Sequence, residues 1–237
     1  MWAGMPADTC YVGVSFYRPE AERGSVRTAL AQVFTSRGEG MVIRGQRFEL
    51  EEAYSAPHMP RNLAADLMHK AIGSYTTVNN GVPPRRLVVH KTSRYWSDEL
   101  EGLQSAASSV PFQTYVTLDE RDVRFVRYMK NYPPARGTLC TMEGVQEAFL
   151  FTRGSITIQR TYPGPYVPKP LVIVEYVGDS PLEHIAHEIM GLSKLNWNAA
   201  LLANFHPITL QFANRVGNIL SAAGPNDPVA SQFRFYM

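Results

Sequence analysis

The sequence is short of the features that mark several large classes of protein. Its only two cysteines, Cys10 and Cys140, lie far apart beside apolar or small residues, which excludes a cysteine-rich zinc site and argues against an oxidised secreted scaffold. No window approaches the roughly 18 uninterrupted apolar residues of a membrane helix. The start, Met1 to Thr9, lacks the basic flank and apolar core of a signal peptide. We therefore expect a soluble, cytoplasmic protein with two buried thiols and no membrane partner.

The sequence also lacks a large excess of positive or negative charge. The chain has 23 basic and 21 acidic residues, a formal net charge of +2, far from the basic excess typical of many nucleic-acid-binding proteins. Any positively charged groove must therefore be local. No phosphate-loop, dinucleotide-binding or nucleophile-elbow motif is present. With 45% apolar residues in 237, the chain is long enough for one substantial core, and we expect a single domain.

The first part of the chain predicts three antiparallel strands in a row. Cys10–Tyr17 is apolar on both faces, which is typical of a central strand covered on both sides. Strands over Thr28–Thr35 and Met41–Ile43 follow, and the two glycines in Ser36–Gly40 between them suit a tight hairpin.

Helices and further strands follow this hairpin. Apolar residues recur at helical spacing over Leu63–Tyr75, and Asn79-Asn80-Gly81 ends that helix. The other predicted elements are a strand over Arg86–His90, a helix over Trp96–Ala107, short strands between Val110 and Gln159, a loop over Tyr162–Pro170, a strand over Leu171–Tyr176, a helix capped by Ser180 that ends near Leu192, and a last helix from Pro207 or Ile208 to Leu220. This order is that of a ribonuclease-H-like α/β domain, in which helices flank a mixed central sheet.

Several segments in this order carry a resemblance to a known family. They are Cys10–Tyr17, Arg85–Ser93, Tyr132–Thr138, Leu195–Asn198 and Pro207–Leu210. Together they resemble the PIWI domain of short prokaryotic Argonautes, from about Thr9 to Met237. The resemblance implies one PIWI domain over residues 1–237, and the MID domain that precedes PIWI in this family is expected to be absent from this chain.

The resemblance also implies that nuclease chemistry is lost. Active PIWI domains hold two Mg²⁺ ions with carboxylates, as ribonuclease H does. The family's first two aspartates fall on Ser15 and Thr92, and a further ligand position falls on Asn214. The candidates for the acidic loop residue are Glu49, Glu51 and Glu52. Because one glutamate cannot hold two hydrated dications, we expect neither a catalytic metal nor enzymatic activity, as in the catalytically inactive type of short Argonaute.

Several cations are candidates for phosphate contacts. Lys91 and Arg94 lie with His90 and Ser93 where a strand ends. The complete set of predicted nucleic-acid contacts is Lys91, Arg94, Arg136, Arg153 and Arg215. Each also has a plain interpretation as a solvated surface charge. The resemblance adds the C-terminal carboxylate of Met237, which in related proteins holds Mg²⁺ at the guide's 5′ phosphate.

These features lead to two functional hypotheses. In the first, the chain binds a guide RNA or DNA and its complementary target, and relays recognition to an APAZ-containing effector (sirtuin-like, TIR or nuclease) in prokaryotic immunity. In the second, the chain is a scaffold that binds the APAZ partner and has little affinity for nucleic acid. An active nuclease would instead need unrelated carboxylates to converge, for example Asp66, Asp98, Asp119 and Glu120.

Overall fold

The computed structural model describes residues 6–18, 26–35, 38–49, 56–125, 133–156, 166–195, 205–222 and 232, without the side chains of 26–29. Its strands form one eight-stranded mixed sheet in the order β3-β2-β1-β4-β5-β8-β7-β6. The chain divides into two compact units. Unit 1 comprises residues 1–115, 177–179 and 209–237, and unit 2 comprises residues 116–176 and 180–208. Among the described helices, none is both long and apolar enough to cross a membrane.

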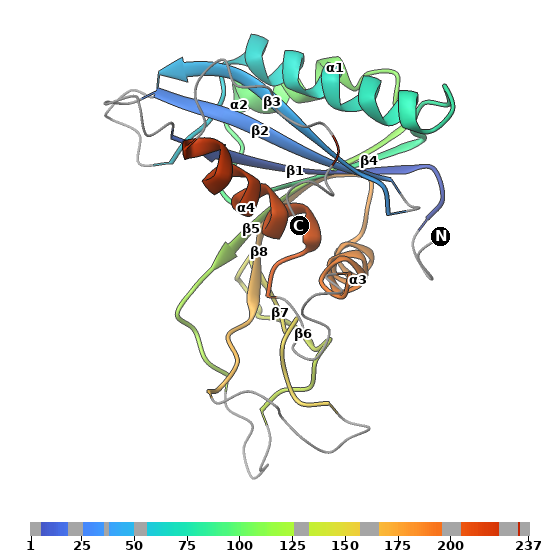
Figure 1. Ribbon diagram of the computed structural model, residues 1–237. Coiled ribbons are helices and arrows are strands. Elements are labelled where there is room, and N and C mark those ends of the chain that lie inside the picture. The colour runs from blue at the N-terminus through green and yellow to red at the C-terminus, as the bar shows by residue number, and fades with distance from the viewer. Residues whose placement is uncertain are drawn as a thin grey trace. The chain divides into compact units, whose positions relative to one another are not determined.

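The strands of unit 1 follow the predicted order (Figure 1). They are β1 (Thr9–Tyr17), β2 (Val26–Thr35), β3 (Gly40–Glu49) and β4 (Arg86–Lys91). β1, β2 and β3 pair antiparallel in succession, which confirms the three-strand prediction, and β1 pairs parallel with β4. At the hairpin, the Gly38 amide donates to the Thr35 carbonyl over 3.0 Å and Gly38 adopts a φ of 91°, so a glycine is favoured there. β3 is longer than predicted.

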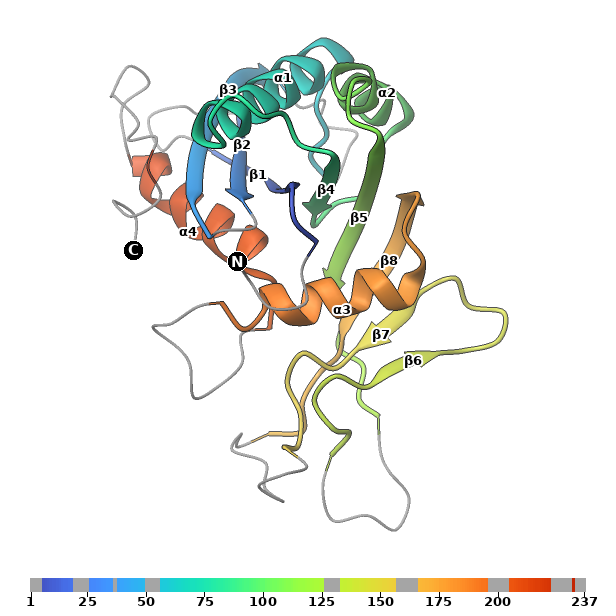
Figure 2. The same ribbon diagram turned by 90° about the vertical axis from the view of Figure 1, so that its right-hand side faces the viewer.

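Three helices cover the two faces of these strands. α1 (Arg61–Val78) and α2 (Ser97–Ala106) lie on one face, and α4 (Ile208–Ala222) lies on the other (Figures 1 and 2). All three were predicted. α1 ends as expected, since Asn79 is its C-cap and both Asn80 and Gly81 adopt positive φ angles.

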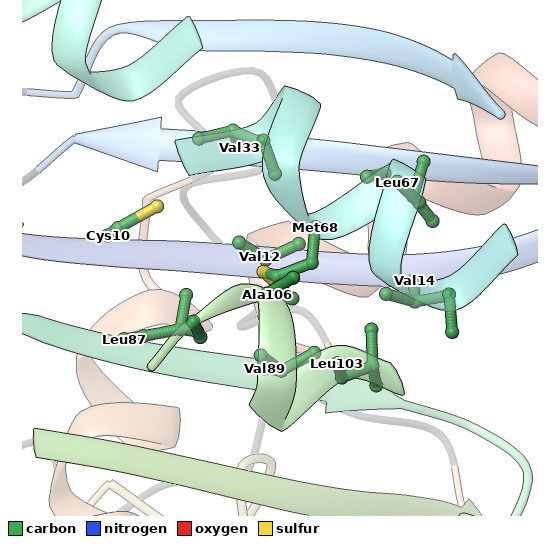
Figure 3. Close-up of a cluster of buried hydrophobic side chains, with 14 of the residues drawn as sticks. Cys10, Val12, Val14, Val33, Leu67, Met68, Leu87, Val89, Leu103 and Ala106 are labelled. Atoms are coloured by element: carbon green, nitrogen blue, oxygen red, sulfur yellow. The ribbon is translucent and has the colours of Figure 1, made fainter. Parts of the chain in front are cut away.

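The main core lies between β1, β2 and β4 and the pair α1 and α2. Alternate residues of β1, namely Cys10, Val12 and Val14, point toward this core with Val33 of β2. Leu67 and Met68 of α1 pack on them, as Figure 3 shows. Phe16 packs against the same core. The alternate set of β1 residues lies on the other face, where a smaller cluster forms from Tyr17, Leu30, Val42, Val216 and Leu220.

Unit 2 holds the later strands and one helix. They are most of β5 (Phe112–Glu120), β6 (Leu139–Thr141), β7 (Ala148–Leu150), most of β8 (Leu171–Gly178), and α3 (Leu182–Leu192). β6, β7 and β8 pair antiparallel in succession. α3 begins with Pro181 as its N-cap and no side-chain cap hydrogen bond, so the prediction that Ser180 caps this helix is wrong.

Candidate nucleic-acid interface

The parallel strands β1 and β4 bring two predicted site residues to neighbouring positions in unit 1. The last recorded pair of these parallel strands is Val14 with Lys91, and Ser15 and Thr92 each come one residue later. Ser15 is 4% exposed, and its hydroxyl has no hydrogen-bond partner among the described residues. Thr92 is exposed. Two residues with hydroxyl groups therefore occupy neighbouring backbone positions where β4 ends.

Helix α4 lies directly against this part of β1. A Cβ atom on Gly13 would come within 2.1 Å of the Thr209 carbonyl oxygen, and one on Gly217 would lie 3.3 Å from Cβ of Tyr17. The helix therefore runs along β1 in the same direction. Ser15 lies between these two contact points on β1, and Ala213, midway between Thr209 and Gly217 on α4, is fully buried. Only a glycine at position 13 allows the helix to approach so closely.

A strip of polar groups is buried between β1, its neighbours and α4. Gly13 pairs with Gln32 on β2 and with His90 on β4. The His90 Nδ1 and Thr209 Oγ1 atoms are 2.9 Å apart and form a buried hydrogen bond. Gln32 is fully buried, and neither polar atom of its amide has a partner among the described residues. This strip therefore differs from the apolar core on the other face.

The groups at the three positions that the resemblance assigns to metal ligands suit a pair of divalent cations poorly. Ser15, Thr92 and Asn214 offer hydroxyl and amide oxygens, whereas a two-metal site depends on carboxylates. Asn214 is exposed on α4, and Glu49 is exposed at the end of β3. Within the described ranges, no three histidine, cysteine, aspartate or glutamate residues gather into a possible metal site. Glu51, Glu52 and Met237 lie outside those ranges.

The prediction for Lys91 needs correction. Its side chain is fully buried and pairs with the carboxylate of Glu99, which is also fully buried. The ammonium lies 5.2 Å from the ring centroid of Phe16 and 5.3 Å from that of Tyr95, distances at which cation–π attraction operates. A buried charge must be paired, and here Glu99 neutralises it. Lys91 is therefore a core residue and does not present its charge to a phosphate.

The other three residues of the predicted cluster at the end of β4 differ in their exposure. His90 is buried under α4, and Ser93 donates through its hydroxyl to the Pro57 carbonyl over 2.9 Å. Arg94 is exposed. Of the four clustered residues, Arg94 therefore has the charge and the exposure that a phosphate contact requires.

Arg215 is exposed on α4, as the prediction required. Asn214 and Asn218 are exposed beside it, whereas Ala213 and Val216 are fully buried. This spacing gives α4 one apolar side toward β1 and one polar side toward solvent. Arg215 thus lies on the helix that covers Ser15, with its guanidinium side chain on the exposed side.

In unit 2, the two predicted turn arginines come from adjacent loops. The Arg136 amide donates to the Ser155 carbonyl over 3.0 Å. A Cβ on Gly154 would lie 2.5 Å from the Pro134 carbonyl oxygen, so the loops pack with their backbones in contact. Arg136 is half-buried, its Nε has no partner among the described residues, and burial lowers its pKa. Arg153 is exposed.

A histidine that sequence reasoning missed lies near Arg153. The Arg153 guanidinium is 5.6 Å from the ring centroid of Phe205, and the Phe205 carbonyl accepts a buried 2.7 Å hydrogen bond from Thr152. Next to it, His206 has its pKa lowered, chiefly by burial and also by the positive charge of Arg153, while Glu120 acts in the opposite direction. Unit 2 therefore presents Arg136, Arg153 and His206 from segments far apart in the sequence.

This chain is similar to known proteins in its fold. No family model and no curated protein matches the sequence. Argonaute from Clostridium butyricum, in a structure with a guide DNA and a 19-mer target DNA, matches with a TM-score of 0.65 and 14% identity over 90% of this chain. Argonaute from Marinitoga piezophila, in complex with a 5′ OH guide RNA and target DNA, matches with a TM-score of 0.62 and 16% identity over 89%.

A third Argonaute, from Aquifex aeolicus, matches with a TM-score of 0.61 and 14% identity over 99% of this chain. The chain spans 27%, 30% and 31% of the Clostridium, Marinitoga and Aquifex chains, respectively. Its fold is therefore that of the ribonuclease-H-like PIWI region of Argonaute, which confirms the predicted fold class.

Proposed function

We propose that this chain is a nuclease-inactive PIWI module of a short prokaryotic Argonaute, which binds a guide strand and its complementary target. The observation that carries this proposal is the neighbouring positions of Ser15, within β1, and Thr92, directly after β4. In the resemblance described above, these are the positions of two metal-binding aspartates. Two of the structurally similar Argonautes were solved with guide and target strands, which supports nucleic acid as the ligand.

The proposed contacts are three exposed arginines and the half-buried Arg136. Arg94 follows β4 and Arg215 lies on α4, both in unit 1, and Arg136 and Arg153 belong to unit 2. Such residues neutralise phosphates without reading sequence, so base pairing between guide and target supplies specificity. Recognition is then relayed to an APAZ-containing effector of the sirtuin-like, TIR or nuclease type. Mg²⁺ at the guide's 5′ phosphate, held by the Met237 carboxylate, remains part of the proposal.

The burial of Lys91 favours a second candidate, a scaffold for the APAZ partner. Without Lys91, the charge available to a phosphate beside Thr92 falls to Arg94. A protein with a net charge of +2 then binds nucleic acid weakly unless its remaining cations act together. The two candidates differ in the affinity they predict for a guide–target duplex.

The test is binding of labelled single strands and guide–target duplexes of about 20 nucleotides, at low and moderate salt with Mg²⁺, beside a cleavage gel. We expect salt-sensitive binding and no product. Arg94→Ala and Arg215→Ala should each weaken binding and lower the slope of log affinity against log salt by about one. Lys70→Ala is the matched control, because Lys70 pairs with Asp66 on α1, away from α4.

Each other result has a defined meaning. No binding at low salt would favour the scaffold, and a Mg²⁺-dependent product would overturn the claim that Ser15 and Thr92 leave the site inactive. Equal losses in Arg215→Ala and Lys70→Ala would show that only overall charge matters, and would remove α4 from the proposed interface.

A further inference from the structure

An aromatic pair, of which Trp96 is exposed and His58 half-buried, lies close to the end of β4. The rings of His58 and Trp96 are stacked, with centroids 4.1 Å apart and an interplanar angle of 12°. Trp96 is 40% exposed, although an indole is a large apolar group that folding ordinarily buries further. His58 belongs to the segment before α1 and Trp96 immediately precedes α2. The half-buried His58 therefore backs one face of the exposed Trp96 ring, and the two residues come from separate segments.

Buried groups hold both segments in place. Glu99 accepts a 3.1 Å hydrogen bond from the amide of Met59, next to His58, and pairs with Lys91. The Lys91 ammonium also donates to the Arg94 carbonyl over 3.4 Å. Ser93 adds its bond to the Pro57 carbonyl. The segments 57–59 and 93–96 are thus fixed to one buried ion pair, and a surface fixed in this way loses little conformational freedom when a ligand binds.

The charges around the pair favour one class of ligand. Arg94 is exposed two residues before Trp96, and Thr92 is exposed two residues before Arg94. The exposed carboxylate of Asp98 lies two residues after Trp96, so the positive charge is on the side of β4. An aromatic surface beside an arginine binds a base by stacking and its phosphate by charge, as single-strand-binding proteins do.

We propose that His58 and Trp96 form a stacking platform for an unpaired nucleobase, with Arg94 contacting the adjacent phosphate. The proposal rests on the proposed function for the class of ligand, and it adds a specific site. The platform acts on single strands, because a base inside a duplex has both faces covered by its neighbours. It therefore receives a nucleotide of guide or target that is not paired.

Intrinsic fluorescence tests the stacking directly. Replacing Trp2 and Trp197 by Phe leaves Trp96 as the sole tryptophan of the three. Adding a single strand of about 20 nucleotides should quench the Trp96 emission. A strand with the same phosphates but abasic sugars should bind through charge and leave that emission unchanged.

Affinity gives an independent measurement. Trp96→Ala should weaken single-strand binding about 5- to 100-fold, the range that loss of one base–aromatic stack produces. Trp96→Phe should keep most of the affinity, and blunt duplex binding should change less than 3-fold in either variant. Phe112→Ala is the matched control, because Phe112 is an exposed aromatic residue of unit 1. The single-strand affinity of this variant should stay within 2-fold of that of the unmodified chain.

The outcomes separate this proposal from the proposed function. If single strands bind but neither quench Trp96 nor distinguish Trp96→Ala from Phe112→Ala, the platform is overturned and the proposed function stands. Equal quenching by the abasic strand also overturns the platform. If no strand or duplex binds at low salt, both proposals fail.

Discussion

The two faces of β1 in unit 1 differ in whether their buried polar groups have partners. On the face toward α1 and α2, the buried charges of Lys91 and Glu99 neutralise each other. On the face toward α4, the hydroxyls of Thr9 and Ser15 and the amide of Gln32 are buried without a partner among the described residues. An unsatisfied buried polar group costs about 1–3 kcal/mol. The first face therefore pairs its buried charges, whereas the second keeps buried polar groups that stability alone does not explain.

The largest effect is expected from breaking the ion pair on the α1 and α2 face. Glu99→Ala leaves the Lys91 charge buried and alone and removes the acceptor of the Met59 amide. Chemical denaturation should show a loss of about 3–5 kcal/mol in the free energy of unfolding. The double variant Lys91→Met/Glu99→Leu should recover most of it, since apolar residues of similar size replace both charges. A double variant as unstable as Glu99→Ala would show that the backbone contacts, rather than the charge, matter.

A similar test on the other face concerns the approach of α4. Gly13→Ala places a methyl group 2.1 Å from the Thr209 carbonyl oxygen, and backbone cannot move aside as a side chain can. We expect a loss of about 3 kcal/mol in the same measurement, at the upper end for overpacking. Gly73→Ala on α1 is the matched control, because a Cβ there meets nothing within 4 Å. It should raise stability by about 0.5–1 kcal/mol, since alanine favours a helix over glycine. A tolerated Gly13→Ala would mean that α4 is not held against β1.

Removing the unpaired polar groups on the α4 face should raise the free energy of unfolding by a smaller amount. Gln32→Leu keeps the approximate volume of the side chain and removes an amide that lacks partners in the described part of the chain. Thermal unfolding should show a gain of about 1 kcal/mol. The same logic applies to Ser15→Ala. Instability of both variants would show that these groups hydrogen-bond to ordered water, and the contrast between the faces would weaken.

The sequence predicted the strands and helices of unit 1 well where the pattern within one segment determines its secondary structure. Cys10–Tyr17 is apolar on both faces, so it indicated a central strand before any partner was known. The helices α1 and α4 carry their apolar residues at helical spacing. The hairpin at Gly38 has the glycine that its positive φ favours. Each of these signals is local, and each prediction is confirmed.

Site residues were harder to predict because their surroundings come from distant parts of the chain. Lys91 was predicted just after a strand, where surface cations are common, but it is the last residue of β4, and its burial depends on Glu99 of another element. His58 and Trp96 are 38 positions apart, and no periodicity links them. Arg215 was placed on the last helix, and it does lie there with an exposed side chain. Its contact with nucleic acid stays a prediction.

The smallest expected effect is on thiol labelling. It tests whether the two faces of β1 lose their packing separately or together. Cys10 lies in the α1 and α2 core, fully buried, and burial raises the pKa of its thiol, so the reactive thiolate is disfavoured. Cys140 is partly exposed. In the folded protein a thiol reagent should label Cys140 quickly and Cys10 only through unfolding, as mass spectrometry of timed samples would show. In Gly13→Ala, Cys10 should stay protected if α4 detaches alone. Loss of that protection in proportion to stability would mean instead that both faces unfold as one unit.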